Sequence, residues 1–400
     1  MNKDLEVWIK RATEKENFKN FEVKFDGQSE KCDGFVGEVL FVTVEGVTES
    51  GESKTLNLVL KVSKESEIVR DAFGRAVFEQ EMHIYEEVLP AFQEFQKQRN
   101  IQDKFASYPK CYKCLKLYKK DVIVLENLKA QGYELHNKLE CFNLAHTRKV
   151  LQQYAKLHAL SFALKDQRPD FFASLVDGSI DSLLDYLKKP RFQQAITESC
   201  ENGVKILMKY GDDKLADKYD KITIDGVDKL KQIYEEKYDQ KVINHGDCWN
   251  NNFMFRYEGG DKSSPASVMI LDWQISVPRS PAYDLAYFLY ATSTDYAGSF
   301  IDLLKEYHEH LIDFLVQLGS SPNLFTFEDL LRHWKRWRYV GAIFTPFVLK
   351  FSYADNEALP EFENSKEADD ITDMMKFTVA NDKLYHQRLK SIVEHFELPL

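Results

Sequence analysis

The sequence predicts an α+β protein of two unequal lobes, a small mixed lobe over residues 1–127 and a large, mostly helical lobe over residues 128–400. Three observations predict this class. Short, β-branched and alternating segments gather in the first third of the chain, and helical periodicity prevails after Leu128. One strand-rich island, residues 241–273, interrupts the helices. A chain of 400 residues also exceeds one simple core.

The expected elements follow from these periodicities. In the small lobe, alternating apolar runs predict four strands: Phe21–Phe25, Val39–Val44, Thr55–Val62 and Asp121–Glu126. One helix, over residues 68–89, is expected between the third and fourth strands. In the large lobe, helical spacing predicts helices over residues 147–164, 182–187, 222–238, 299–318, 326–340 and 366–395. The segment 258–267, EGGDKSSPAS, is expected to be a loop that joins two strands of the island.

The acidic composition narrows the possible partners. The formal net charge is −11 and the pI is about 5.5, whereas nucleic-acid binding and a polybasic membrane anchor both require a basic surface. We therefore expect neither nucleic acid nor a membrane as the partner. Charges occur throughout the first residues, and no apolar run approaches the roughly eighteen residues of a spanning helix. A soluble, cytoplasmic protein is expected.

The six cysteines are scattered and do not form the pattern of a disulfide framework. Cys111 and Cys114 have CxxC spacing, which leaves a zinc or redox site as the alternative to two ordinary thiols. Ordinary thiols are the favoured interpretation because no second pair of this spacing accompanies them.

A lysine and a glutamate stand out in the small lobe. Strict alternation in the strand TLNLVLKV puts its leucines on one face and Lys61 on the other. In the helix that follows, Glu81 occupies a position on the apolar stripe formed by Phe73, Val77, Ile84 and Val88. A buried carboxylate is costly without a cation, so Lys61 is its expected partner. The alternatives are a solvated strand lysine and a glutamate at the edge of the stripe.

The island contains a polar segment between two apolar ones. In VINHGDCWNNNFMF two apolar strand-like pieces flank residues 244–252, which we call the polar loop. Its side chains compete with sheet hydrogen bonding, so a functional reason is expected. Further on, VMILDWQIS places Asp272 at the end of a buried strand.

The order of these residues matches the phosphoryl-transfer template of kinases: a strand lysine, a helix glutamate, His-x-Asp-x-x-x-x-Asn and a strand-end aspartate. In that template Lys61 meets the α- and β-phosphates of ATP and Glu81 fixes its orientation. Asn252 and Asp272 supply oxygen ligands to Mg²⁺, and Asp247 accepts the proton of the attacking hydroxyl.

Two further residues are expected to hold the polar loop in shape, His245 within it and Asp284 in the apolar helix start PAYDLAYFL. Asp284 is expected to accept backbone N–H bonds from the loop. The alternative role for Asp284 is a helix N-cap.

These motifs, HGDCWNNN, ILDWQ and PAYDLAYFL, resemble those of the ecdysteroid kinase-like (EcKinase, CHK kinase-like) family. The family is a branch of the choline kinase and aminoglycoside phosphotransferase group. The resemblance extends from Phe35 to about Phe351. It implies the bilobal protein-kinase-like fold, with an antiparallel sheet in the small lobe. His158, in LHALSFAL, is interpreted as a core histidine.

The same resemblance assigns a nucleotide site. Val124-Leu125-Glu126-Asn127-Leu128 is similar to the hinge between the lobes, so Glu126 and Leu128 are expected beside adenine. Gly34, Phe35 and Gly37 belong to the loop that would cover the phosphates, although Gly34-Phe35-Val36-Gly37 replaces the polar run of many relatives.

Departures from protein kinases indicate the acceptor. Trp249 stands where protein kinases carry a lysine, and Asp272-Trp273-Gln274 replaces Asp-Phe-Gly. Both changes favour a small molecule over a protein hydroxyl. The resemblance implies ATP- and Mg²⁺-dependent phosphorylation of an ecdysteroid or another lipophilic alcohol, in hormone inactivation or xenobiotic conjugation. The alternatives are a choline- or ethanolamine-type kinase and a pseudokinase that binds nucleotide without catalysis.

Overall fold

A computed structural model describes residues 3–29, 37–292, 300–353, 379 and 381–396. The small lobe is a five-stranded antiparallel sheet in the order β1-β2-β3-β5-β4. Its strands are β1 (Phe18–Gln28), β2 (Gly37–Thr48), β3 (Ser53–Ser63), β4 (Cys111–Leu117) and β5 (Lys120–Glu126). The four predicted strands lie within β1, β2, β3 and β5. β4 was missed because its sequence CYKCLKL carries two lysines and a register shift after Cys111 interrupts its alternation.

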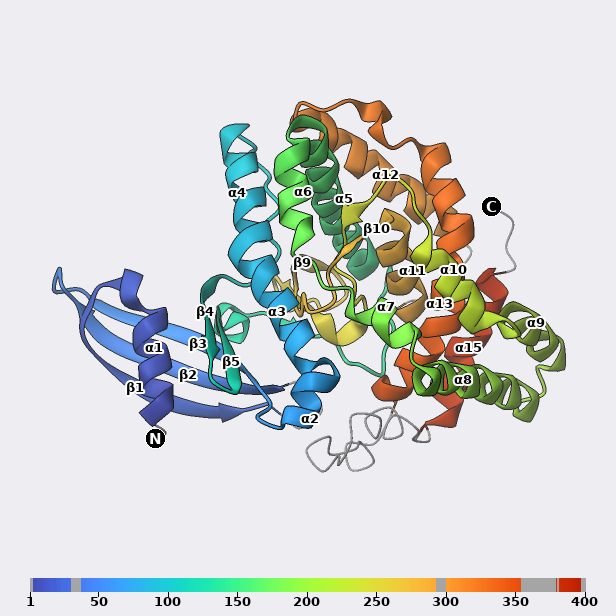
Figure 1. The fold of residues 1–400 in the computed structure, drawn as a ribbon, viewed down its shortest axis with the longest axis horizontal. Helices are drawn as coiled ribbons and strands as arrows, with labels where there is room; N and C mark the ends of the chain where they lie inside the picture. Colours follow the sequence, from blue (N-terminus) through green and yellow to red (C-terminus); the bar gives the residue numbers. More distant parts are fainter. Residues whose placement is uncertain (1–2, 30–36, 293–299, 354–378, 380, 397–400) are drawn as a thin grey trace.

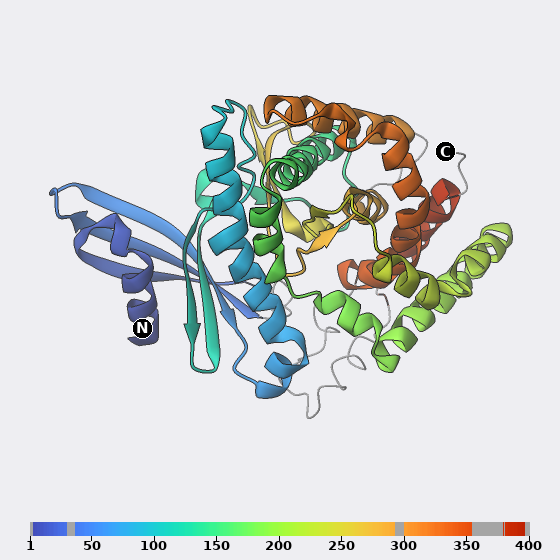
Figure 2. The same cartoon turned by 45° about the horizontal axis from the view of Figure 1, so that its top comes forward.

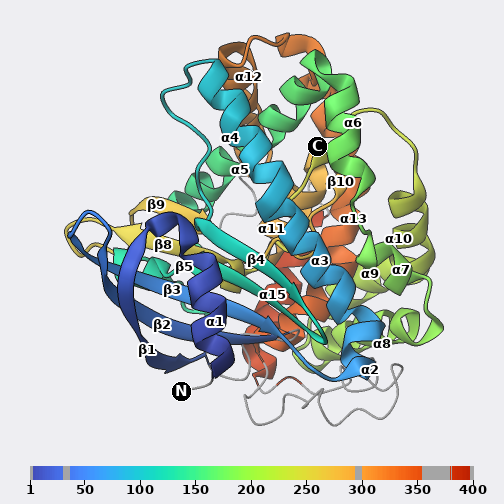
Figure 3. The ribbon, with the colours of Figure 1, turned by 60° about the vertical axis from the view of Figure 1, so that its left-hand side comes forward.

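The two faces of the sheet differ. On one face the leucines of β3 pack beneath helix α1 (Lys3–Ala12), which lies across the strands in Figure 3. The buried residues of this outer core include Leu5, Trp8, Ile9, Val42, Leu58, Leu60 and Val124. Lys61 emerges on the opposite face, as the alternation of β3 predicts.

The helix after β3 is longer than predicted. It runs as α2 (Glu67–Val69), a π-helical turn η3 (Arg70–Gly74), α3 (Arg75–His83), a second π-helical turn η4 (Ile84–Val88) and α4 (Leu89–Gln98). Pro90 does not end it, because Pro90 lies in the first turn of α4, directly after the wider π-helical turn. Figures 1 and 2 show this helix between the sheet and the large lobe.

The large lobe is mostly helical. Its helices are α5 (Leu144–Gln167), α6 (Pro169–Asp177), α7 (Ser182–Leu187), α8 (Pro190–Lys209), α9 (Asp213–Thr223), α10 (Gly226–Glu235), α11 (Pro281–Thr292), α12 (Phe300–Gln317), α13 (Phe327–Ser352) and α15 (Asp382–Phe396). The helix predicted over residues 222–238 is wrong in its bounds, because the chain turns between α9 and α10. Of the helix predicted over residues 366–395, residues 366–378 and 380 lie outside the described residues.

Helix α13 continues well beyond its predicted end at Val340. Pro346 cannot donate a hydrogen bond to the carbonyl of Ala342, and such a proline normally breaks a helix. Here the hydroxyl of Tyr219 donates to that carbonyl at 3.3 Å, and the hydroxyl of Tyr385 donates to the carbonyl of Pro346 at 3.0 Å. The contact from α9 therefore compensates for the missing N–H, and the contact from α15 adds a second hydrogen bond beside the proline.

The strand-rich island forms two small sheets within this lobe. β7 (Val242–Ile243) pairs with β10 (Pro278–Arg279), and β6 (Glu134–Leu135), β8 (Phe253–Tyr257) and β9 (Pro265–Ile270) form a three-stranded sheet. The polar loop connects β7 to β8. The predicted flexible loop is shorter than expected because β9 already begins at Pro265.

One continuous core joins the long helix to the large lobe. Val77, Phe78 and Tyr85 of the helix belong to the same buried cluster as Tyr154 of α5 and Trp273. The helix is thus fixed on both sides, which sets the position of Glu81. Within the described part of the chain, no helix is long and apolar enough to span a membrane.

An ion pair anchors the start of this helix to the sheet, and we expect its removal to destabilise the protein. Arg70 is buried and donates to the Ser63 hydroxyl at 2.6 Å and to Asp121 Oδ2 at 2.9 Å. Asp121→Ala leaves a buried guanidinium without its carboxylate, which should lower the free energy of unfolding by about 3 kcal/mol in urea denaturation.

The matched control is Asp103→Ala. Asp103 is 86% exposed and pairs with Lys156 at 2.6 Å on the surface, so its loss should change the unfolding free energy by less than about 1 kcal/mol. Equal effects of the two substitutions would contradict the anchoring role of Arg70.

Candidate active site

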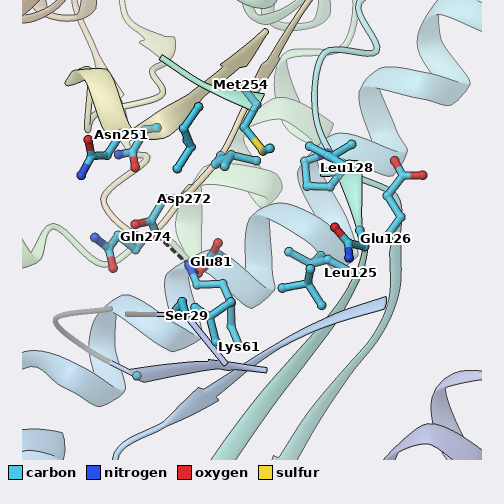
Figure 4. Close-up of a pocket in the computed structure, with 18 of the residues that line it drawn as sticks. Ser29, Lys61, Glu81, Leu125, Glu126, Leu128, Asn251, Met254, Asp272 and Gln274 are labelled. Atoms are coloured by element: carbon cyan, nitrogen blue, oxygen red, sulfur yellow. Dashed lines mark hydrogen bonds and ion pairs between the residues drawn. The ribbon is translucent and has the colours of Figure 1, made fainter. Parts of the chain in front are cut away.

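A cleft between the lobes brings together most of the residues predicted from the sequence (Figure 4). The sheet contributes Gly37, Val39, Val59 and Lys61, and α3 contributes Glu81. The end of β5 and the connection that follows it contribute Leu125–Leu128. The large lobe contributes Asp247, Trp249, Asn251, Asn252, Met254, Asp272 and Gln274. Residues far apart in the chain therefore line one cavity.

Lys61 is paired with two carboxylates. Its ammonium lies 2.5 Å from Glu81 Oε2 and 2.6 Å from Asp272 Oδ1 (Figure 4). The predicted pair with Glu81 is present, and Glu81 is only 1% exposed. The pair with Asp272 was not predicted, because 211 residues separate its members.

The three groups of this triad shift one another's pKa values. Burial raises the pKa of Glu81 against the effect of Lys61, and the nearby charge of Asp272 adds to the rise. Burial opposes the charge of Lys61, but Asp272 and Glu81 outweigh it and raise the pKa of Lys61. Lys61 is therefore held as a cation, and two of its three N–H donors are engaged. The third can reach an additional anion in the cleft.

The polar loop orients Asp247 through both carboxylate oxygens. Asn252 Nδ2 donates to Asp247 Oδ2 and to the Asp247 backbone carbonyl, each at 2.9 Å. The hydroxyl of Tyr287 donates to Asp247 Oδ1 at 3.1 Å. Burial raises the pKa of Asp247, and the charge of Asp272 raises it further. The carboxylates of Asp247 and Asp272 are therefore close enough to repel each other, and a cation near both would be stabilised.

Asp284 lies beneath the loop and is fully buried. Its carboxylate accepts the backbone N–H of His245 at 2.8 Å and of Gly246 at 2.9 Å. The expected bonds from the loop to Asp284 are thus present, in place of the alternative N-cap. His158 contacts Asp284 Oδ2 at 3.0 Å through Nε2 and the Tyr307 hydroxyl at 2.7 Å through Nδ1.

This environment keeps Asp284 ionised, as an acceptor for the N–H groups of the loop. Burial alone would raise its pKa, but His158 and the loop groups lower the pKa below the ordinary value. His158 is a core histidine, as interpreted from the sequence. The ring of His245 reaches Leu271 O at 2.8 Å, which ties the loop to the residue preceding Asp272.

Two residues of the site have backbone conformations with positive φ. Gly246 has φ 94°, and a side chain there would also meet the carbonyl oxygen of Ile275. Asp272 has φ 66°, a conformation that is uncommon for any residue except glycine and is concentrated at functional sites. The turn at Asp272 directs its carboxylate to Lys61.

The hinge end of the cleft is apolar. Leu128 and Met254 lie there, opposite the sheet (Figure 4). Glu126 also lines the cleft, but its side chain is used within the hinge: Oε1 accepts the backbone N–H of Lys110 and Oε2 accepts Gln131 Nε2, both at 2.7 Å. Gly37 lines the cleft at the start of β2. Gly34 and Phe35 lie outside the described residues.

Tyr287 is a site residue that the sequence reasoning missed. The sequence did contain a signal for it, because Tyr287 follows Asp284 by three positions and therefore shares a helix face with it.

Cys111 and Cys114 stay free thiols, with 3.8 Å between their sulfur atoms.

The donor set for a metal is small. Among the residues that the structure describes, no group of three or more His, Cys, Asp or Glu is placed to hold an ion. The predicted metal ligands, Asp272 and Asn252, both line the cleft and offer one carboxylate and one amide oxygen. Such a set fits Mg²⁺, which takes one or two carboxylates and completes its octahedron with phosphate oxygens and water.

A small antiparallel lobe, a large helical lobe and this cleft between them define a protein of the kinase-like class. The chain matches the ecdysteroid kinase-like family over residues 31–320 and belongs to that family. The resemblance seen in the sequence and the protein-kinase-like fold are thereby confirmed. The family match supports a kinase function directed at small molecules.

Solved structures similar to this chain include the GDP complex of a mutant aminoglycoside 2′-phosphotransferase-IIIa, with 12% identity and a TM-score of 0.39. That match covers 89% of this chain and 99% of the other. A glucosamine kinase matches at 13% identity and a TM-score of 0.29, over 83% of this chain and 92% of the other. No curated protein matches the chain.

The close approach at Gly246 leads to a stability prediction. Gly246→Ala combines a strained φ with a clash against the Ile275 carbonyl, which is backbone and cannot turn aside. In urea denaturation we expect a loss of about 2 kcal/mol or more in unfolding free energy.

Gly259→Ala is the matched control. Gly259 also has a positive φ, 68°, but has open space around its Cα. It isolates the cost of backbone conformation, about 1 kcal/mol. If the two variants lose the same stability, the loop is not held against Ile275.

Proposed function

We propose that this protein transfers the γ-phosphate of ATP to a hydroxyl of a small lipophilic molecule, such as an ecdysteroid or another lipophilic alcohol, in hormone inactivation or xenobiotic conjugation. The observation that carries the proposal is the convergence of Lys61, Glu81, Asp247, Asn252 and Asp272 on one cleft. These residues have the types and the order of the kinase phosphoryl-transfer template.

Lys61 and Glu81 would bind the phosphates. The ion pair to Glu81 holds the ammonium inside the cleft, and its remaining N–H would donate to the α- and β-phosphate oxygens. Asp272 lies on another side of the same ammonium. The phosphates would therefore share Lys61 with both carboxylates.

Asn252 and Asp272 would hold Mg²⁺. The Asn252 amide nitrogen is engaged with Asp247, which leaves its carbonyl oxygen as the donor for a metal. The ion would supply charge neutralisation of the transferring phosphoryl group. The hinge would receive the adenine ring through its backbone groups, at Glu126 and against Leu128. Gly37 would lie near the phosphates, with Gly34 and Phe35 expected there as well.

Asp247 would act on the acceptor. Its burial and the neighbouring Asp272 raise its pKa, which makes it a better proton acceptor. Trp249, Asn251 and Gln274 line the same cleft and are uncharged. The choice of a steroid-like or other lipophilic acceptor over a cationic one is supported by the family match.

The test is a mass-spectrometric screen for phosphorylated products with ATP and Mg²⁺. The panel contains polyhydroxylated steroids, other lipophilic alcohols, choline and ethanolamine. Phosphorylated steroid or alcohol supports the proposal. Phosphocholine would assign the alternative choline-type kinase. Binding of ATP without transfer to any acceptor would identify a pseudokinase.

Asp247→Asn should lower kcat for acceptor phosphorylation by about 100-fold or more, because the amide cannot accept the proton of the hydroxyl. ATP affinity, measured by calorimetry, should stay nearly unchanged. Asp261→Asn, in the exposed loop between β8 and β9, is the control and should retain the full rate. A variant at Asp247 that keeps most of its rate would refute the assignment of the base.

Asp272→Ala should abolish the Mg²⁺-dependent part of ATP binding, since one of the two carboxylates near the phosphates is lost. The measurement is ATP titration with Mg²⁺ and with chelator, for this variant and for Asp261→Ala. Magnesium should strengthen ATP binding to the control only. An equal effect of magnesium on both variants would place the ion elsewhere.

A further inference from the structure

Helix α11 contacts the polar loop with three side chains on one of its faces. The hydroxyl of Tyr283 donates to the Gly246 carbonyl at 2.8 Å. Asp284 accepts the backbone N–H groups of His245 and Gly246. Tyr287 donates to Asp247 Oδ1 at 3.1 Å. The first two contacts hold the backbone of the loop, whereas Tyr287 alone reaches the side chain of Asp247.

We propose that Tyr287 is a positioning residue for phosphoryl transfer, which holds the Asp247 carboxylate in the orientation that meets the acceptor hydroxyl. The inference rests on the proposed function and deepens it.

The orientation of a carboxylate depends on how many of its oxygens accept a hydrogen bond. Rotation about the Cβ–Cγ bond of an aspartate is soft, because this torsion has broad preferences. One donor on one oxygen leaves that rotation largely free. Here Asn252 binds Oδ2 and Tyr287 binds Oδ1. Two donors, one on each oxygen, fix the plane of the group and leave its remaining lone pairs for the acceptor.

The position of the Tyr287 hydroxyl is itself fixed. Tyr287 is 1% exposed, and its ring packs edge-on against Phe344 with centroids 5.8 Å apart. A carboxylate has only acceptor oxygens, so the phenol O–H is the donor of the bond to Asp247.

A second tyrosine on the same helix separates this role from packing. Tyr290 is equally buried, at 1% exposure, and its hydroxyl has no hydrogen-bond partner among the described residues. Burial of a phenol in α11 therefore does not depend on a hydrogen bond to the loop. The hydroxyl of Tyr287 differs from that of Tyr290 in its contact with Asp247.

The orientation of the Asp247 carboxylate matters in the transfer step. The acceptor O–H gives its proton to Asp247 as the acceptor oxygen bonds to the γ-phosphorus and the bond from that phosphorus to the oxygen of ADP breaks. Without Tyr287 the carboxylate turns away in part of the molecules. Fewer complexes then hold the acceptor hydroxyl in line, and water attacks more often in its place.

The experiment compares Tyr287→Phe with Tyr290→Phe in the full chain, with ATP, Mg²⁺ and an acceptor from the screen. For Tyr287→Phe we expect kcat to fall about tenfold or more, with the KM for ATP and the melting temperature close to those of Tyr290→Phe. The yield of phosphorylated acceptor per ADP formed should also fall. Tyr290→Phe should keep both the rate and this yield.

The outcomes separate the inference about Tyr287 from the proposed function. If the unmodified protein transfers phosphate and Tyr287→Phe keeps its kcat and yield, the inference is overturned and the proposed function stands. If Tyr287→Phe loses rate only together with stability and ATP affinity, the tyrosine is structural and the inference is again overturned. If the unmodified protein transfers no phosphate to any acceptor, the proposed function fails and the inference fails with it.

Discussion

The arrangement of the cleft depends on one ammonium group shared by two carboxylates from different parts of the molecule. Lys61 comes from the sheet, Glu81 from the long helix and Asp272 from the large lobe. Each carboxylate would be costly inside the protein without a cation, and one lysine serves both. The pairing therefore fixes the sheet, the helix and the large lobe relative to one another.

The backbone groups of the polar loop are buried and lie outside regular sheet, so they need other hydrogen-bond partners. Helix α11 provides these partners: the ionised Asp284 accepts from two loop amides, and Tyr283 donates to a loop carbonyl. Asp284 is in turn held by His158, which connects the loop to α5 and, through Tyr307, to α12. The shape of the loop is thus a property of the large-lobe core.

Much of the site could be predicted because its signals are local. The alternation of β3 places Lys61 opposite the core face, and Asp247 and Asn252 are only five positions apart in the sequence. Glu81 was recognisable as a carboxylate on an apolar stripe. Two of the wrong predictions, at β4 and at the end of α13, also have a physical reason. β4 carries a register shift that hides its alternation. Helix α13 continues past Pro346 because a tyrosine of α9 donates to the carbonyl that the proline leaves without its partner.

The sequence by itself determined the order of the lobes, the chemistry of the cleft residues and the family motifs, since these reside in residue type and short spacing. Only the tertiary structure decided which groups meet: Asp272 with Lys61, Tyr287 with Asp247 and His158 with Asp284. The members of these pairs lie between 40 and 211 residues apart in the chain. No periodicity operates over such separations, so packing of the elements alone brings the partners within hydrogen-bonding distance.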